Sequence, residues 1–352
     1  MDEEWLKVIK SVAPGTALRE ALDNILRART GALLVFGDTR AIQGLVDGGI
    51  SINADFSPPL LYELAKMDGA IILDSEGKKI LHANAQLVPD AGIPSFETGI
   101  RHRTAERFAR QTEQMVIAIS QRRNTITLYK GSRKYMVRDI AYVLAKANHA
   151  IQTLEKYKSA FDDALAYLTM LELGGVVTLR DVALVLRRIE MTVAIISEIV
   201  FYATELGTEG RFVGTGMEQM GILMRRERYL LLKDYHASGE EERIHEAERL
   251  LETKKDEEML SDQEIVKILG HGAAPPETEV APRGYRLLGQ IPKIPTAVID
   301  SLVKEFGSLS NIVQASIDEL DRVTGVGEAR AKAIQEGLRR MKERCRPKSE
   351  SR

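Results

Sequence analysis

The segment 98–107 concentrates side chains that bind anions. The sequence predicts that a helix begins here, and its first turn holds Arg101, His102, Arg103 and Thr104. Free backbone N–H groups and the positive end of the helix dipole already favour an anion at such a turn. Cations in this turn work against helix stability, so their presence indicates side chains that are offered to phosphates. The alternative is a surface patch whose charges pair with neighbouring glutamates.

A second candidate is Asp68-Gly69-Ala70, where a predicted helix meets a predicted strand. Glycine lets a backbone approach a ligand closely. The carboxylate of Asp68 could hold a divalent metal or orient a ribose hydroxyl. Most Asp-Gly pairs are simple turns, and Asp47-Gly48 is predicted to be one. The motif is therefore informative only together with the basic segment.

The elements that must position these residues lie in the first 140 residues, where strand and helix patterns alternate. Such alternation favours an α/β domain with a central mixed sheet. Ser57, followed by two prolines, is typical of a helix start, because serine caps free N–H groups and proline has none to lose. Thr98 and Gly99 are predicted to cap the basic helix. The predicted strands are 31–36, 71–73, 79–87, 115–120, 125–129 and an edge at 135–137.

Beyond residue 140 the strand signals stop, and apolar residues recur at three- and four-residue spacing, which predicts a helical spine. We expect its Met and Leu stripes to pack as core. Thr178 and Asp181 resemble a capping box at a helix start. The segment 273–279 is rich in proline and small residues, which indicates a linker. The predicted helices are 140–173, 179–206, 217–235 and 240–260.

After the linker, the chain around residues 320–334 resembles a helix-hairpin-helix motif. Its Gly-Val-Gly hairpin would leave N–H groups open at a helix start, where they can hold a DNA phosphate. Contacts of this kind position a protein and read no bases. The segment 288–295 looks like a degenerate first copy, with a proline where the second glycine would fall. Such units also serve as plain packing elements. The residues predicted to contact DNA are Gly325, Val326, Gly327, Arg330 and Lys332.

Charge is unevenly distributed along the 352 residues, whose formal net charge is -2. From Arg283 onward there are 14 Lys/Arg against 9 Asp/Glu, whereas the segment 238–264 has 11 acidic residues against 4 basic ones. A basic end behind an acidic stretch is typical of a terminal module that meets a polyanion, although a solvated tail has the same composition. The single cysteine, Cys345, excludes an intrachain disulfide and a cysteine-rich metal site. With no signal peptide and no apolar run of about 20 residues, the sequence predicts a cytoplasmic protein.

Asp68-Gly69-Ala70, followed by Gly99 and the basic string 101–107, closely resembles the diadenylate cyclase domain. With the helical spine and hairpin module behind it, the chain resembles the DNA integrity scanning protein family along essentially its whole length. The resemblance implies an α/β cyclase domain with a central mixed sheet, an all-α helical spine and a C-terminal helix-hairpin-helix DNA-binding module. Their expected bounds are 1–140, 141–272 and 285–345.

The resemblance implies that two ATP molecules are condensed into cyclic di-AMP and pyrophosphate. Each 3′-hydroxyl attacks the α-phosphate of the other nucleotide. Asp68 would position or activate this hydroxyl with Mg²⁺ or Mn²⁺, the expected cofactor. Ile100 departs from the family, which usually has a small or hydroxyl residue there, and this would remove at most one phosphate contact. The implied catalytic residues are Asp68, Arg101, His102 and Arg103, and the further nucleotide contacts are Gly69, Ala70, Leu87, Thr104 and Ser120.

The resemblance also implies partners. Two nucleotides must face each other, so two cyclase domains would meet head to head, in the family within an octamer. The other expected partner is DNA, branched and bound without base specificity, which lowers cyclase output in the family. The alternative is a DNA-repair scaffold with a non-catalytic ATP-sensing domain, and the intact Asp68 and Arg101-His102-Arg103 argue against it. A nucleotide-binding regulator without DNA contact would leave the Gly-Val-Gly hairpin and the basic end unexplained.

Overall fold

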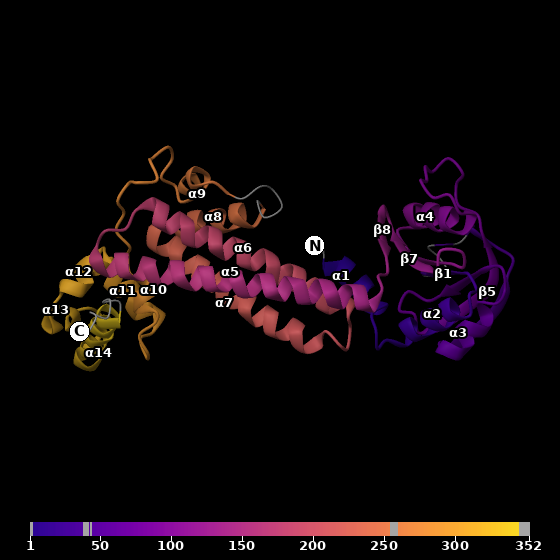
Figure 1. The fold of residues 1–352 in the computed structure, drawn as a ribbon, viewed down its shortest axis with the longest axis horizontal. Helices are drawn as coiled ribbons and strands as arrows, with labels where there is room; N and C mark the ends of the chain where they lie inside the picture. Colours follow the sequence, from indigo (N-terminus) through magenta and orange to yellow (C-terminus); the bar gives the residue numbers. More distant parts are fainter. Residues whose placement is uncertain (1–2, 38–41, 43, 254–259, 345–352) are drawn as a thin grey trace, which may run out of the picture. The chain divides into compact units, whose positions relative to one another are not determined.

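The fold is that of a computed structural model, which describes residues 3–37, 42, 44–253 and 260–344 (Figure 1). Cys345 and the rest of the basic end lie outside these residues. The chain divides into two compact units, Met1–Ala147 with Phe201–Gly214, and Asn148–Val200 with Thr215–Arg352. The expected fold class, an α/β domain followed by a helical spine and a helix-hairpin-helix module, is confirmed. No helix of the described residues is long and apolar enough to cross a membrane.

The first unit is built on a mixed sheet of eight strands among the described residues, in the order β2-β5-β4-β1-β6-β7-β8, with β3 also paired to β5. β1 and β4 are parallel, and the other pairs are antiparallel. The predictions for 79–87 and 115–120 match the observed strands, whereas β2 and β3 were not predicted. The strands are β1 Ala32–Phe36, β2 Val46–Asp47, β3 Ile50–Asp55, β4 Ala70–Leu73, β5 Lys79–Leu87, β6 Met115–Ser120, β7 Thr125–Lys130 and β8 Arg133–Met136.

Helices cover both faces of this sheet, which explains why β1 is apolar and buried along its whole length. Leu34 and Phe36 belong to the core that α1, α2 and α3 share with one face. Leu33 and Val35 belong to the core beneath α4 on the other face. Figure 1 shows α4 on one side of the sheet and α2 and α3 on the opposite side. These helices are α1 Glu3–Ser11, α2 Ala17–Arg27, α3 Pro58–Leu64 and α4 Ile100–Thr112.

The two helices beside the candidate site begin where the sequence predicts, although the prediction that Thr98 helps to cap α4 is wrong, because its hydroxyl accepts from Arg123 instead. The Ser57 hydroxyl accepts a hydrogen bond from the Leu60 N–H at 3.4 Å, and the two prolines occupy the first turn of α3. Gly99 is the N-cap of α4 with an extended backbone, and no side chain caps this helix. The N–H groups of the first turn of α4 therefore stay available to a ligand.

The second unit is entirely helical apart from one isolated bridge, as far as the structure describes it. Thr178 and Asp181 form the predicted capping interaction, with the Thr178 N–H donating to Asp181 at 2.9 Å. The predicted helix end at Leu260 is wrong, because Leu260 is not helical; α8 is described as Glu241–Thr253, and the predicted residues 254–259 lie outside the described residues. The helices from residue 140 on are α5 Ile140–Gly174, α6 Leu179–Glu205, α7 Arg211–Tyr235, α8 Glu241–Thr253, α9 Asp262–Ile268, α10 Tyr285–Leu288, α11 Thr296–Phe306, α12 Leu309–Gln314, α13 Ile317–Asp321 and α14 Gly327–Arg344.

Two hairpins end this unit, and they share a left-handed residue two positions before the residue that opens the next helix. Gly325 has a left-handed φ of 85°, and Lys293, two residues before Pro295, has a φ of 67° at the equivalent place in the first hairpin. Pro295 is the N-cap of α11, as the glycine at 327 opens α14. The degenerate first copy predicted from 288–295 is therefore confirmed as a hairpin. Both hairpins share one apolar core.

A buried polar cluster joins the hairpin module to the long helices within this unit. The fully buried Asp234, on α7, accepts hydrogen bonds from the N–H groups of Gly284, Tyr285 and Arg286 at 2.7, 2.7 and 2.9 Å. The Arg286 guanidinium, also buried, pairs with Glu172 on α5. Because an unpaired buried charge or N–H group is costly, this cluster fixes where α10 begins.

Replacing Asp234 by alanine should therefore destabilise the second unit by about 3 kcal/mol, since three N–H groups lose their acceptor. Chemical denaturation followed by circular dichroism measures this loss. Asp300→Ala is the matched control, because Asp300 is half-exposed and its pairing with Lys233 is worth less than about 1 kcal/mol. Equal effects of the two substitutions would contradict the proposed role of Asp234.

Candidate nucleotide-binding site

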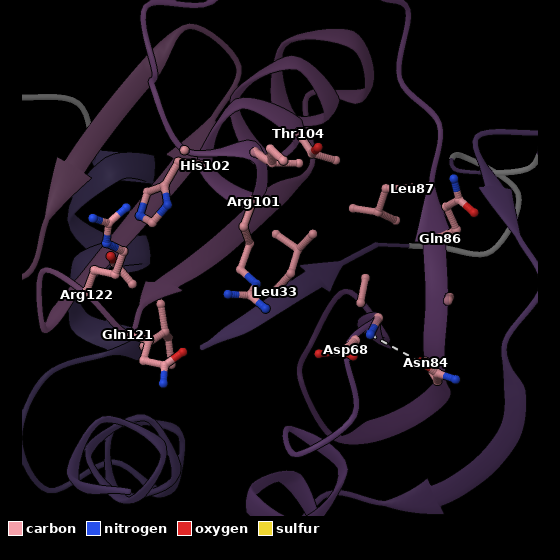
Figure 2. Close-up of a pocket in the computed structure, with 17 residues that line it drawn as sticks. Leu33, Asp68, Asn84, Gln86, Leu87, Arg101, His102, Thr104, Gln121 and Arg122 are labelled. Carbon is pink, nitrogen blue, oxygen red and sulfur yellow. Dashed lines mark hydrogen bonds between the residues drawn. The ribbon is translucent and has the colours of Figure 1, made fainter. Parts of the chain in front are cut away.

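A cleft of about 760 Å³ opens where the N-terminal turn of α4 meets the strands β4, β5 and β6 (Figure 2). This volume lies within the range of small-molecule sites. Figure 2 shows His102 and Arg122 on one side of the cleft and Asp68 and Asn84 on another, with Arg101 between them. The lining residues are Leu33, Asp68, Gly69, Ala70, Asn84, Ala85, Gln86, Leu87, Gly99, Ile100, Arg101, His102, Thr104, Ile119, Ser120, Gln121 and Arg122.

The cleft brings together most of the predicted nucleotide contacts, although they come from segments up to 52 residues apart, as Asp68 and Ser120 do. Arg103 is the exception. Its side chain is exposed, does not line the cleft, and donates from Nε to the Glu97 carbonyl oxygen at 3.3 Å. The predicted residues that do line the cleft are Asp68, Gly69, Ala70, Leu87, Arg101, His102, Thr104 and Ser120.

Arg101 can point into the cleft because Gly31, just before β1, has no side chain. A Cβ atom built on Gly31 would lie 2.1 Å from the Arg101 Nη1 atom, so a larger residue there would displace the guanidinium from its present position. From the sequence, Gly31 was predicted only to begin a strand. Its role at the site depends on the pairing of β1 with β6, which the sequence pattern did not reveal.

Gly69 is held against β5 by Asn84, which sequence reasoning missed. The Gly69 N–H donates to Asn84 Oδ1 at 3.1 Å, drawn as the dashed line in Figure 2. A Cβ on Gly69 would lie 2.4 Å from the Asn84 carbonyl carbon, so only glycine fits. Asn84 has a left-handed φ of 54° at a register shift between β4 and β5. An asparagine inside a strand pattern is a signal for such a bulge, because it tolerates this conformation.

His102 is buried and does not supply the positive charge expected of it. Its ring packs edge-on against Tyr129, with ring centroids 6.4 Å apart. Burial lowers the pKa of His102 below its usual 6.5, and Glu97 only partly opposes this. The imidazole is therefore neutral at neutral pH. The cations that line the cleft are Arg101 and Arg122, and sequence reasoning treated Arg122 only as part of a turn.

Asp68 lies exposed between α3 and β4 at the rim of the cleft. The described residues hold no group of three or more His, Cys, Asp or Glu side chains arranged for a metal ion. A metal at Asp68 would therefore take its other ligands from water and a bound nucleotide. Mg²⁺ commonly binds one or two carboxylates together with substrate phosphates, so this donor set fits the ion.

The residues predicted to contact DNA lie at the second hairpin, but Val326 is not open to a ligand, because its side chain is buried in the hairpin core and its N–H donates to the Val323 carbonyl oxygen at 3.0 Å. Gly325 and Gly327 both have left-handed φ angles, 85° and 66°, which explains the Gly-Val-Gly sequence. Arg330 donates to the Gly325 carbonyl at 2.5 Å, and Lys332 pairs with Glu328 at 2.5 Å. The side chains of Arg330, Lys332 and Glu328 are exposed, so these local interactions are weak and can exchange for phosphate contacts.

Comparison with known proteins agrees with this arrangement of sites. Residues 19–134 match the family model for the nucleotide-binding region of the DisA bacterial checkpoint controller. Residues 137–277 match the linker region of the same controller, and residues 285–340 match a SAM-like helix-hairpin-helix tandem. The fold and the site thus define a nucleotide-binding α/β domain that is linked by long helices to a tandem hairpin module.

Full-length relatives narrow this class to one family. The chain is 53% identical to the DNA integrity scanning protein DisA of Carboxydothermus hydrogenoformans, over 97% of this chain and 98% of that protein. It is 49% identical to the DisA proteins of Clostridium botulinum, strain Loch Maree, and of Bacillus cereus, over 97% of this chain and 97% and 96% of the relatives. The chain belongs to the DNA integrity scanning protein DisA family.

The state of His102 can be measured directly. Since its pKa is lowered in the folded chain, the unfolded chain binds the proton first as the pH falls below about 6.5. Stability should therefore decrease as the pH falls through the window below 6.5. An NMR titration, with the signal assigned by its loss in His102→Gln, should give a midpoint below 6.5. A midpoint at or above 6.5 would contradict the buried, neutral imidazole.

Proposed function

We propose that this chain is a diadenylate cyclase that condenses two ATP molecules into cyclic di-AMP and two pyrophosphates, under the influence of DNA bound by its C-terminal module. The observation that carries the proposal is the convergence of Asp68 and Arg101 on one cleft at the open N-terminal turn of α4. This cleft lies in the domain that matches a nucleotide-binding family. Family membership supports the wider class, a nucleotidyltransferase.

The cleft residues divide the work of holding ATP. The N–H groups at the start of α4, with Arg101 and Arg122, meet the negative charge of the phosphates. The neutral His102 gives at most one hydrogen bond as a donor. Thr104 and Ser120 add hydroxyl groups, and the apolar side chain of Leu87 lies against the base or ribose. Phosphoryl transfer needs mainly alignment and charge neutralisation, so the absence of a strong base in this set is no obstacle.

Asp68 orients the attacking 3′-hydroxyl from the rim of the cleft, where its carboxylate is exposed. Mg²⁺ or Mn²⁺, held by Asp68 and the phosphates, would neutralise charge on the nucleotide when bound. Gly69 and Ala70 bring the backbone of β4 close to the nucleotide, and Asn84 fixes this approach.

One chain supplies half of the reaction, because each ATP is attacked by the other. We infer that two copies meet head to head with their clefts facing, in the larger octameric assembly of the family. Two exposed apolar side chains support this arrangement. Phe96 is 89% exposed, three residues before the cap of α4, and Ile100 at the cleft is 84% exposed. Covering them by a second copy removes apolar surface from water.

The tandem hairpins support DNA as the second partner, bound through its phosphates without base specificity and with a preference for branched structures. We infer that such DNA lowers cyclase output and that the protein works in the cytoplasm. The competing proposal, a DNA-repair scaffold with a non-catalytic ATP-sensing domain, predicts the same binding but no cyclic product.

Incubation of the protein with ATP and Mg²⁺ or Mn²⁺, followed by mass spectrometry, tests the enzyme proposal. The wild-type chain should yield cyclic di-AMP, and Asp68→Asn should lose about a hundredfold or more of the rate while still binding ATP. Asp47→Asn is the matched control, because it alters an exposed Asp-Gly pair outside the cleft. ATP binding by an assembled wild-type protein without cyclic product would favour the scaffold.

The head-to-head arrangement predicts a separate defect. Phe96→Gln should weaken self-association and lower the rate of cyclic di-AMP formation at dilute protein. The substitution replaces an exposed apolar side chain by a polar one, so a second copy no longer removes apolar surface from water there. ATP affinity per chain should stay unchanged, since Phe96 does not line the cleft. Sedimentation velocity and product analysis measure the two effects. Met136→Gln, at an exposed apolar residue on β8, is the control, and equal behaviour of both variants would contradict the arrangement.

A further inference from the structure

Glu97 is a buried carboxylate two residues before the cap of α4, and the nucleotide contacts named above do not include it. Only 9% of the residue is exposed. It accepts a hydrogen bond from the Tyr129 hydroxyl on β7 at 2.9 Å and an ion pair from Lys134 on β8. Burial works to raise the pKa of Glu97, but donation by Lys134 and Tyr129 outweighs it and holds the pKa below its usual value. Glu97 is therefore ionised at neutral pH.

The backbone of Glu97 is fixed as firmly as its side chain. The Glu97 N–H donates to Ser95 Oγ at 3.2 Å, and its carbonyl oxygen accepts from Arg103 Nε at 3.3 Å. The next residue, Thr98, accepts a hydrogen bond from Arg123 at 3.0 Å. The chain entering α4 is thus tied to the sheet and to the β6–β7 turn immediately before Gly99, where the candidate phosphate site begins.

Tyr129 links this carboxylate to the cleft itself. Its hydroxyl donates to Glu97, while its ring packs edge-on against His102 in the first turn of α4. Moving Glu97 would therefore disturb both the entry to α4 and the His102 ring. Arg103, the predicted nucleotide contact that faces away from the cleft, has a use here, since it supports the Glu97 carbonyl.

We propose that Glu97 is a positioning residue of the nucleotide site, which holds the N-terminal turn of α4 in place through Tyr129 and Lys134. It touches neither substrate nor metal and acts through the turn that carries Arg101 and His102. This inference rests on the proposed function for its substrate, ATP. It also explains Arg103, Tyr129 and Lys134, which do not line the cleft, as residues that support Glu97.

The test compares Glu97→Gln with Glu205→Gln. Glu205 offers matched contacts in the same unit, because it too is a buried carboxylate that receives a tyrosine hydroxyl, Tyr135, and a cation, Arg138. The two differ in that burial raises the pKa of Glu205 to about 7, whereas the pKa of Glu97 is lowered. It does not line the cleft. Both substitutions should lower the Tm. Only Glu97→Gln should weaken binding of a non-reacting ATP analogue and raise KM for ATP, by about tenfold, because small misplacements of binding groups have effects of this size or larger.

Lys134→Met gives a second, milder variant, since Lys134 is half-exposed and Glu97 keeps its hydrogen bond from Tyr129. It should weaken analogue binding in the same direction, and combining it with Glu97→Gln should add little, because the two residues act as a pair. Analogue binding equal to wild type in Glu97→Gln, or an equal loss in Glu205→Gln, would overturn the proposal. Binding is measured without turnover, so a wild-type protein that makes no cyclic di-AMP would refute the proposed function and still leave the role of Glu97 decided.

Discussion

Under the proposed function, the charge of a nucleotide's phosphates is the constraint that the first unit must satisfy. The phosphates would bind at the N-terminal turn of α4, whose cap, Gly99, has no side chain to occupy the first N–H groups. Arg101 and Arg122 add full charges, whereas burial keeps His102 neutral. Two buried cations in one turn would destabilise the fold. Instead, the Arg101 guanidinium lies against Gly31, and Arg122 lies in an exposed turn. The positive charge at the cleft therefore comes from Arg101 and Arg122, which lie on separate elements.

Close backbone approach is the second requirement, and the sheet provides it. β1 lies between β4 and β6, so Gly31 before β1 lies against Arg101, while Asp68 and Gly69 before β4 line the cleft that Arg101 also lines. Gly31 leaves room for a side chain, and Gly69 leaves room for the backbone of Asn84. The helices on both faces bury β1 completely, which keeps these distances fixed. The sheet thus holds in place a site whose residues come from separate segments of the chain.

The sequence predicted those features that depend on local chemistry. The strand at 79–87, the proline-opened α3 and the glycine-capped α4 follow from periodicity and capping. The motif residues on α4 and before β4 were predicted to share a site, and the cleft contains them apart from Arg103. β2 was missed because it has only two residues. β3 was also missed, although Ile50, Ile52 and Ala54 alternate there with polar residues, because the strand is largely exposed and contributes little to the core.

What the sequence did not predict depends on contacts between distant segments. The role of Asn84 requires the register shift between β4 and β5, and that of Gly31 requires the position of Arg101. The outward direction of Arg103 follows from its hydrogen bond to the Glu97 carbonyl oxygen, and the neutral state of His102 follows from its burial, which outweighs the opposing charge of Glu97. A pattern of residue types marks a basic turn, but only the folded chain decides which of its side chains carry charge into the cleft.

The central claim is that the first turn of α4 binds phosphates, and a comparison of adenosine, AMP, ADP and ATP tests it most directly. Calorimetry should show affinity that rises along this series and falls with added salt, because each phosphate adds contacts to the N–H groups and guanidiniums. Arg101→Ala should flatten the series. If adenosine binds as tightly as ATP and salt has no effect, the cleft recognises the base alone and the account of α4 is wrong.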